Sequence, residues 1–281
     1  MSIISKGKYY LQEIAFNFSK GDTFGDKMGL TGQALSFHWY NQKKELKRID
    51  EKAIKHSINL PPGKQDVYLR THSGDMFVFY EIFLEDTYEL PKNWTQNVKS
   101  IVDLGANIGM TTLYYYQLFP QAHFVCVEAA STNFDILQKN LLPLSSKNKL
   151  TALEGAIYHE SGEVSFETEA IAWGGKINQE SQNTITTTKV RAYDMPEIMQ
   201  KAGIEEIDIL KIDIEGGEED LLGKNTEWLN KVKVIIIELH GNYDLERLKA
   251  DISPYGFEII LPTEQENLQM IAAISKERLN K

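Results

Sequence analysis

The first residues that could do chemistry form a short glycine-containing loop, Asp103-Leu-Gly-Ala-Asn-Ile-Gly109. An apolar stretch typical of a buried strand precedes the loop, and a helical pattern follows it. Glycine lets the backbone approach a ligand closely, and the start of a helix directs unpaired N–H groups at the loop. Glu128 stands at the end of the next predicted strand, where a carboxylate can accept hydrogen bonds from both hydroxyls of a ribose. The pattern therefore predicts a site for a nucleoside-containing ligand.

Two classes of cofactor, NAD(P) and S-adenosylmethionine (SAM), use this arrangement. A dinucleotide fingerprint reads Gly-x-Gly-x-x-Gly, but here Asn107 stands where the second glycine should be. Its side chain would hinder a pyrophosphate, and Asp103 repels phosphates while suiting the cationic amino-acid end of SAM. We expect the following residues to bind SAM: Asp103, Gly105, Asn107, Gly109 and Glu128. An NAD(P)-dependent oxidoreductase stays as an alternative.

A second group of polar residues lies at the carboxyl ends of two later predicted strands, residues 207–214 and 232–239. They are Lys211, Asp213 and Glu215 on the first strand, and Glu238 and His240 on the second. Within each strand these residues share one face, because side chains alternate along a strand. Central parallel strands normally read as apolar runs, and ligands of open α/β sheets bind at the carboxyl ends of the strands. We therefore expect a substrate-facing rim; a structural ion pair of Lys211 with Asp213 or Glu238 is the alternative.

The elements that must position these residues alternate between strand and helix from residue 100 onward. Strands are expected at residues 101–104, 124–127, 150–157, 207–214, 232–239, 256–261 and 267–274. Alternation of strands and helices implies a parallel, doubly wound α/β sheet. The last two strands are joined by a short turn, which permits only antiparallel pairing. We predict a mainly parallel sheet with an antiparallel C-terminal hairpin.

The region before residue 100 is less regular. Residues 1–60 show no clean periodicity, and Pro61-Pro-Gly63 is a candidate boundary. Residues 67–70 and 76–80 flank the turn signal Ser73-Gly-Asp75 and predict a β-hairpin. We expect an N-terminal accessory segment at 1–63, a β-hairpin and lead-in at 64–99, and the catalytic domain at 100–281.

Composition excludes several classes of function. With a net charge of −10, the chain gives no sign of the basic surface that binds nucleic acid or anionic lipid. The longest apolar runs are far shorter than the roughly 20 residues that cross a bilayer, and the N-terminus has no signal-peptide core. Cys126 is the single cysteine, so no internal disulfide can form. We expect a cytoplasmic protein without nucleic-acid binding or membrane insertion, and its oligomeric state stays open.

Taken in order, these motifs resemble the FkbM-type methyltransferases. The matching pieces are Leu69-Arg70 with Ser73-Gly-Asp75, Val102 to Gly109, Val127-Glu128, Glu154-Gly-Ala156, Leu210-Lys-Ile-Asp-Ile-Glu-Gly216 and Ile237-Glu-Leu-His240. The resemblance implies a SAM-dependent O-methyltransferase with a Rossmann-like, seven-stranded fold. It also implies that the Asp103–Gly109 loop and Glu128 bind SAM, and that the acceptor is a hydroxyl of a sugar, glycan or natural product. Residues 1–60 match no shared motif, so the acceptor itself is not identified.

Methyl transfer is an in-line displacement, in which the acceptor oxygen must be aligned with the methyl group and lose its proton. We expect Asp213, Glu238 and His240 to act on the acceptor, with His240 as the base, because an unperturbed imidazole titrates near neutral pH. The same cluster could hold a divalent cation that acidifies the hydroxyl. We favour the protein base and assign no metal ligands. A non-catalytic SAM-binding or scaffold protein is the remaining alternative.

Overall fold

The computed structural model describes residues 3–42, 52–61, 63–91, 94–167, 187–260 and 270–279. The chain separates into two compact units. The first unit comprises the described residues of Met1–Thr87 together with Leu113–Pro120. The second unit comprises the described residues of Tyr88–Thr112, Gln121–Glu167 and Thr186–Lys281. Among the described residues, no helix is long and apolar enough to cross a membrane.

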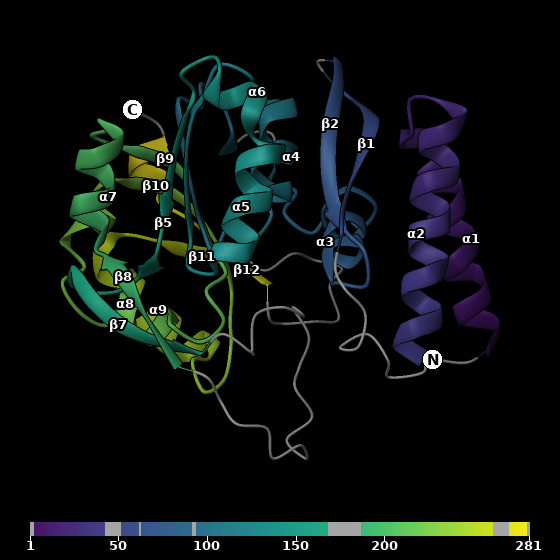
Figure 1. Ribbon diagram of the computed structural model, residues 1–281. Helices are drawn as coiled ribbons and strands as arrows, with labels where there is room; N and C mark the ends of the chain where they lie inside the picture. The colour runs from purple at the N-terminus through teal and green to yellow at the C-terminus, as the bar shows by residue number, and fades with distance from the viewer. Residues whose placement is uncertain are drawn as a thin grey trace. The chain divides into compact units, whose positions relative to one another are not determined.

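The second unit is built on a seven-stranded sheet with the order β11-β12-β10-β9-β3-β4-β5. Figure 1 labels β5, β9, β10, β11 and β12 of this sheet. The strands are β3 (Ser100–Leu104), β4 (His123–Glu128), β5 (Leu150–Glu154), β9 (Ile207–Ile212), β10 (Val232–Glu238), β11 (Glu258–Ile260) and β12 (Met270–Ile274). The five strands from β10 to β5 run parallel. β12 pairs antiparallel with both β10 and β11. The predicted fold, a mainly parallel sheet with an antiparallel C-terminal hairpin, is confirmed.

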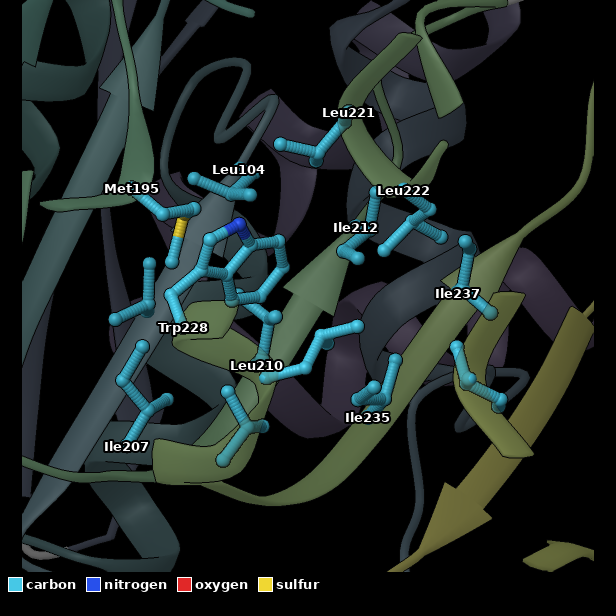
Figure 2. Packing of buried hydrophobic residues seen from close by; sticks show 14 of the residues in the cluster. Leu104, Met195, Ile207, Leu210, Ile212, Leu221, Leu222, Trp228, Ile235 and Ile237 are labelled. Atoms are coloured by element: carbon cyan, nitrogen blue, oxygen red, sulfur yellow. The ribbon is translucent and has the colours of Figure 1, made fainter. Parts of the chain in front are cut away.

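Helices connect these strands or, in the case of α10, follow the last of them. They are α4 (Met110–Leu118), α5 (Ser131–Asn140), α6 (Leu142–Ser145), α7 (Met195–Ala202), α8 (Glu218–Leu222), α9 (Leu245–Ile252) and α10 (Lys276–Leu279), with the short turns η3 (Glu227–Lys231) and η4 (Ser253–Tyr255). One face of the sheet packs against α7, α8, α9 and η3 in a single apolar core. Figure 2 shows Trp228 and Met195 beside Leu210 in that core.

On the central strands, the side chains that point away from this apolar core include polar residues. Asp103 in β3 and Lys211 in β9 are register partners. Their neighbours on either side, Val102 with Leu210 and Leu104 with Ile212, point into the apolar core. Because side chains alternate along a strand, Asp103 and Lys211 lie on the other face of the sheet.

A separate three-stranded sheet extends this unit, with the order β6-β8-β7. Its strands are β6 (Ala156–Ile157), β7 (Gly162–Glu167) and β8 (Thr187–Tyr193). The predicted strand 150–157 is therefore two strands, divided at Gly155, whose φ is +153°. A Cβ at Gly155 would lie 2.5 Å from the carbonyl oxygen of Arg191 in β8, so the close approach of β8 requires glycine there.

The first unit contains α1 (Ile3–Lys20), α2 (Phe24–Gln42), β1 (Ala53–Leu60), β2 (Gly63–Arg70) and α3 (Asp75–Phe83). The predicted β-hairpin is wrong in its second strand. β2 pairs instead with β1, and Leu60 is the register partner of Gly63, so the expected boundary at Pro61–Gly63 is a hairpin connection.

Residues 76–80, predicted as a strand, belong to helix α3. The helix buries Met76, Phe79, Tyr80 and Phe83, which have helical spacing, but an unbroken apolar run does not by itself distinguish a strand from a buried helix. The Ser73-Gly-Asp75 signal starts this helix. Asp75 accepts hydrogen bonds from the backbone N–H of Arg70 at 2.7 Å and from its guanidinium.

Candidate active site

The glycine loop between β3 and α4 is joined to the end of β9. Gly105 has a φ of +70°, and a Cβ there would lie 1.8 Å from the carbonyl oxygen of Asp213. The backbone N–H of Asp213 donates to the carbonyl of Leu104 at 3.1 Å. We expected glycine at this position to allow close approach of a ligand, but the structure shows that the approaching group is the protein's own backbone.

The rest of the loop is tied to the end of β4. The backbone N–H groups of Gly105 and Ala106 both donate to the carbonyl of Val127, at 3.0 Å each. Asn107 adopts a φ of +49°, and its N–H donates to Glu128 Oε2 at 2.8 Å. These bonds hold the loop in one conformation.

Gly109, at the end of the loop, has a φ of +84°. A Cβ there would lie 3.0 Å from the Leu141 side chain. The glycine therefore permits close packing of the loop on the segment after α5.

Glu128 is a buried carboxylate, 5% exposed, at the end of β4. In addition to the Asn107 bond, its Oε1 accepts the backbone N–H of Ala130 at 2.9 Å. Burial raises the pKa of Glu128, and the backbone hydrogen bonds oppose that rise. Oε1 also accepts a hydrogen bond from Asn133 Nδ2 at 3.4 Å. A carboxylate oxygen can accept two hydrogen bonds, so Oε2, which accepts the Asn107 N–H, can also accept one from a ribose hydroxyl. The sequence did not predict that Glu128 would hold the loop.

A buried lysine lies between the loop and the end of β9. Lys211 Nζ is 3.3 Å from Asp103 Oδ1 and 3.3 Å from Asp213 Oδ2, and it donates to the carbonyl of Gly105 at 2.8 Å. Burial alone would lower the pKa of Lys211, but the charges of Asp213 and Asp103 outweigh it and raise that pKa. The Lys211–Asp213 pair of the structural alternative is therefore present.

Asp103 is enclosed by protein groups. Its side chain is 1% exposed, and besides the Lys211 contact it accepts a hydrogen bond from Thr112 Oγ1 at 2.8 Å. These contacts favour a role in fixing Lys211 and the loop over the expected direct contact with the cationic end of SAM.

The structure brings the three predicted acceptor-side residues together around His240. Its Nε2 lies 3.7 Å from Glu238 Oε1 and 3.9 Å from Asp213 Oδ1. Glu215 Oε2 is 3.6 Å from the same nitrogen. On the other side of the ring, Nδ1 is 2.9 Å from Glu218 Oε1. The imidazole is thus bonded on one edge and faces three carboxylates on the other.

This environment changes the charge of His240. Burial lowers its pKa, but the hydrogen bond and charge of Glu218 and the charges of Glu215 and Asp213 raise it to about 9. These carboxylates therefore favour the protonated form of His240 at neutral pH, whereas the sequence favoured His240 as the base. Burial, followed by the charge of Asp213, raises the pKa values of both Glu215 and Glu238.

Two residues of this cluster were missed from the sequence. Glu218 is fully buried and is the first residue of α8; its place three residues after Glu215 was the available signal. Tyr88 donates its hydroxyl to Asp213 Oδ2 at 3.1 Å. No local pattern could have found Tyr88, because it lies 125 residues away in the sequence.

Comparison with known proteins identifies the family. A model described as the methyltransferase FkbM domain matches residues 103–270, more than half of the chain. The chain belongs to the FkbM methyltransferase family. This membership disfavours the oxidoreductase alternative, and the residues of the loop and of the His240 cluster lie inside the matched range.

Relatives of this FkbM-family chain include methyltransferase sdnD of Sordaria araneosa, 25% identical over 68% of this chain and 90% of that protein. The 2-O-methyltransferase NoeI of Sinorhizobium fredii is 27% identical over 49% of this chain and 62% of its own length. The hexuronic acid methyltransferase AglP of Haloferax volcanii is 27% identical over 58% of this chain and 63% of its own length. Among solved structures, an FkbM methyltransferase of Methylobacillus flagellatus is 14% identical with a TM-score of 0.49, over 70% of this chain and 47% of that one.

Three side chains of the cluster around His240 could bind a metal ion. Asp213, Glu238 and His240 each offer one ligand atom, and these three atoms lie within 4.8 Å of one another. Carboxylate oxygens suit hard divalent cations, so the cation alternative from the sequence is compatible with the geometry. The sequence also offers Trp173-Gly-Gly175 either as a segment that closes over a ligand or as an ordinary surface loop, and these residues lie outside the described ones.

Proposed function

We propose that this chain is a SAM-dependent O-methyltransferase that methylates a hydroxyl of a sugar, glycan or natural product. The observation that carries the proposal is the juxtaposition of Gly105 and Asp213. A Cβ on Gly105 would lie 1.8 Å from the Asp213 carbonyl oxygen, so the glycine loop and the carboxylate–histidine cluster meet at one point. Methyl transfer needs the donor and the acceptor to be held side by side.

The cofactor side of the site would consist of Gly105, Asn107, Gly109 and Glu128. SAM supplies a methyl group on a sulfonium and therefore needs no further activation. Glu128 would accept a ribose hydroxyl through the remaining lone pair of Oε2. Asp103 would act indirectly, by holding Lys211 against the Gly105 carbonyl.

The acceptor side would consist of Asp213, Glu238 and His240. An attacking hydroxyl must transfer its proton to a group within hydrogen-bond reach. Glu238 is our preferred base, because it faces His240 Nε2 at 3.7 Å and does not share the Lys211 and Tyr88 contacts of Asp213. His240 would orient Glu238 and balance the negative charge of the cluster. A divalent cation bound by the same three side chains is the second mechanism.

Two relatives support the class of acceptor. The name of NoeI specifies methylation at a 2-oxygen, and the name of AglP specifies a hexuronic acid. An oxygen atom on a carbohydrate is therefore the first acceptor to test.

The test is a transfer assay with SAM and a panel of sugars, uronic acids, glycans and hydroxylated natural products, with S-adenosylhomocysteine as the readout. Glu128→Ala, assayed at a limiting SAM concentration, provides the control with impaired SAM binding. We expect turnover with at least one oxygen acceptor. Tight SAM binding without turnover on any member of the panel would favour the non-catalytic alternative, and absence of SAM binding would reject both.

A further inference from the structure

Between Leu11 and Tyr40, no exposed residue of the α1–α2 hairpin is charged, and most are apolar. Its exposed large apolar side chains are Leu11, Phe18, Phe24, Met28, Leu35 and Trp39. From Phe24 to Tyr40, every exposed residue of α2 is apolar or glycine. A surface helix normally places charged side chains on its outer face, and 25% of this chain is charged. The outer face of the hairpin therefore departs from the rest of the molecule.

Two acidic side chains of the hairpin make contacts within the same unit. Glu13 is 2% exposed and lies 2.7 Å from His38 Nε2. Asp26 accepts the backbone N–H of Ser57 in β1 at 2.9 Å. The hairpin packs on its own unit through apolar residues such as Phe16, Leu30 and Phe37, and its solvent face is apolar as well.

A glycine on the outward face has no explanation within a single chain. A Cβ at Gly32 would meet nothing within 4 Å, and a glycine inside a helix is destabilising relative to alanine. Gly29 differs, because a Cβ there would lie 3.1 Å from the His56 ring. Gly32 lies between Met28 and Leu35 on the apolar face, where a missing side chain lets a second helix come close.

We propose that this face binds the same face of a second copy of the chain, in a two-fold symmetric four-helix interface. A two-fold axis brings the same patch of both copies together, so an apolar face is complementary to itself. The net charge of −10 makes copies repel one another, and that repulsion is weakest where a surface carries no charge.

The size of the face fits such an interface. The helices contain 18 and 19 residues, so each is about 28 Å long at a rise of about 1.5 Å per residue. Two helices about 10 Å apart present roughly 550 Å² per copy. The total exceeds the roughly 1,000 Å² expected of a specific interface.

Sedimentation velocity over a concentration series tests this inference on the full chain. The wild type should sediment with twice the mass of the 32.1 kDa chain. Leu35→Glu places two buried charges, one from each copy, in the interface and should raise the dimer dissociation constant at least about tenfold. Leu142→Glu is the control, because Leu142 is 64% exposed in α6, and it should leave the mass unchanged.

Gly32→Leu gives a second, independent reading. The position is open in the single chain, so the variant should fold normally but separate the two copies. A wild type that is monomeric at all concentrations would overturn the inference, and so would a Leu35→Glu variant that dimerises like the wild type. Unfolding of both variants would show that the face is covered within one chain. A monomer that floats with phosphatidylcholine vesicles would assign the face to lipid instead.

Discussion

The ammonium group of Lys211 lies 3.3 Å from the Asp103 carboxylate, and both side chains are at most 3% exposed. The two residues are register partners in adjacent parallel strands, so the sheet itself brings them together. Lys211 also donates to the carbonyl of Gly105. One buried cation therefore links β3, which precedes the glycine loop, the loop itself and β9, which ends one residue before Asp213.

Lys211→Met should destabilise the protein strongly, because it leaves the Asp103 carboxylate buried without its cation. Removing one partner of a buried pair typically costs about 3–5 kcal/mol. Urea unfolding measures the loss. The double variant Lys211→Met/Asp103→Asn should recover a large part of it, and equal destabilisation of the single and double variants would show that the pair is not the cause.

Gly105→Ala should abolish SAM binding and destabilise the fold, because the new Cβ would collide with the Asp213 carbonyl oxygen. Gly203→Ala is the matched control: its φ is +64°, but nothing lies within 4 Å of the added Cβ. That control isolates the cost of a left-handed conformation, about 1–2 kcal/mol. Calorimetric titration and urea unfolding compare the two variants, and equal effects would argue against the collision.

Glu128→Ala should weaken SAM binding. Losing a charged hydrogen-bonding group typically costs about 1.5–3 kcal/mol, which corresponds to roughly a 10- to 150-fold increase in Kd. Glu154→Ala is the control, because Glu154 is exposed and is the register partner of Glu128 at the end of β5. Unchanged SAM affinity in a folded Glu128→Ala variant would place the ribose elsewhere.

His240 should make stability depend on pH. Its pKa in the folded chain is raised from 6.5 to about 9, so the folded state binds a proton that the unfolded state releases. Its stabilising contribution is fully present below pH 6.5 and is lost as the pH rises through 9. The free energy of unfolding should fall across that interval. The same measurement on His240→Gln should lack this fall, and a matching fall in that variant would assign it to other groups.

Glu238→Gln and Asp213→Asn should lower the rate of methyl transfer much more than they weaken SAM binding. A positioned base typically contributes about 10²–10⁴-fold in rate. With a protein base, a chelator leaves the wild-type rate unchanged, which is the outcome we expect. If chelation stops turnover and Mg²⁺ or Mn²⁺ restores it, the cluster holds a cation. Full turnover in both variants would make the cluster structural.

The sequence by itself determined the sheet and indicated several of the polar residues that lie at its carboxyl edge. Short apolar strands alternating with helices leave few possible topologies, so the parallel sheet and its antiparallel hairpin could be predicted. Lys211 and Asp213 stand at alternate positions, as do Glu238 and His240. Because side chains alternate along a strand, this spacing indicated that each pair shares one face at the carboxyl edge of the sheet.

The N-terminal unit could not be predicted in the same way. Helix α2 has apolar residues on its buried face, such as Leu30 and Phe37, and also on its exposed face, such as Leu35 and Trp39. The helical period is visible only when one face is polar. Residues 76–80 have the same difficulty, because an unbroken apolar run is common to a strand and a buried helix.

Only the tertiary structure decided the chemical state of the site. The pKa of His240 depends on Glu218 and on carboxylates from separate segments of the chain. The need for glycine at position 105 arises from the Asp213 carbonyl, more than a hundred residues away. Asp103 is enclosed because Lys211 is its partner across the sheet. Charge, strain and enclosure are properties of groups brought together in space, and the spacing of residues along the chain carries no measure of them.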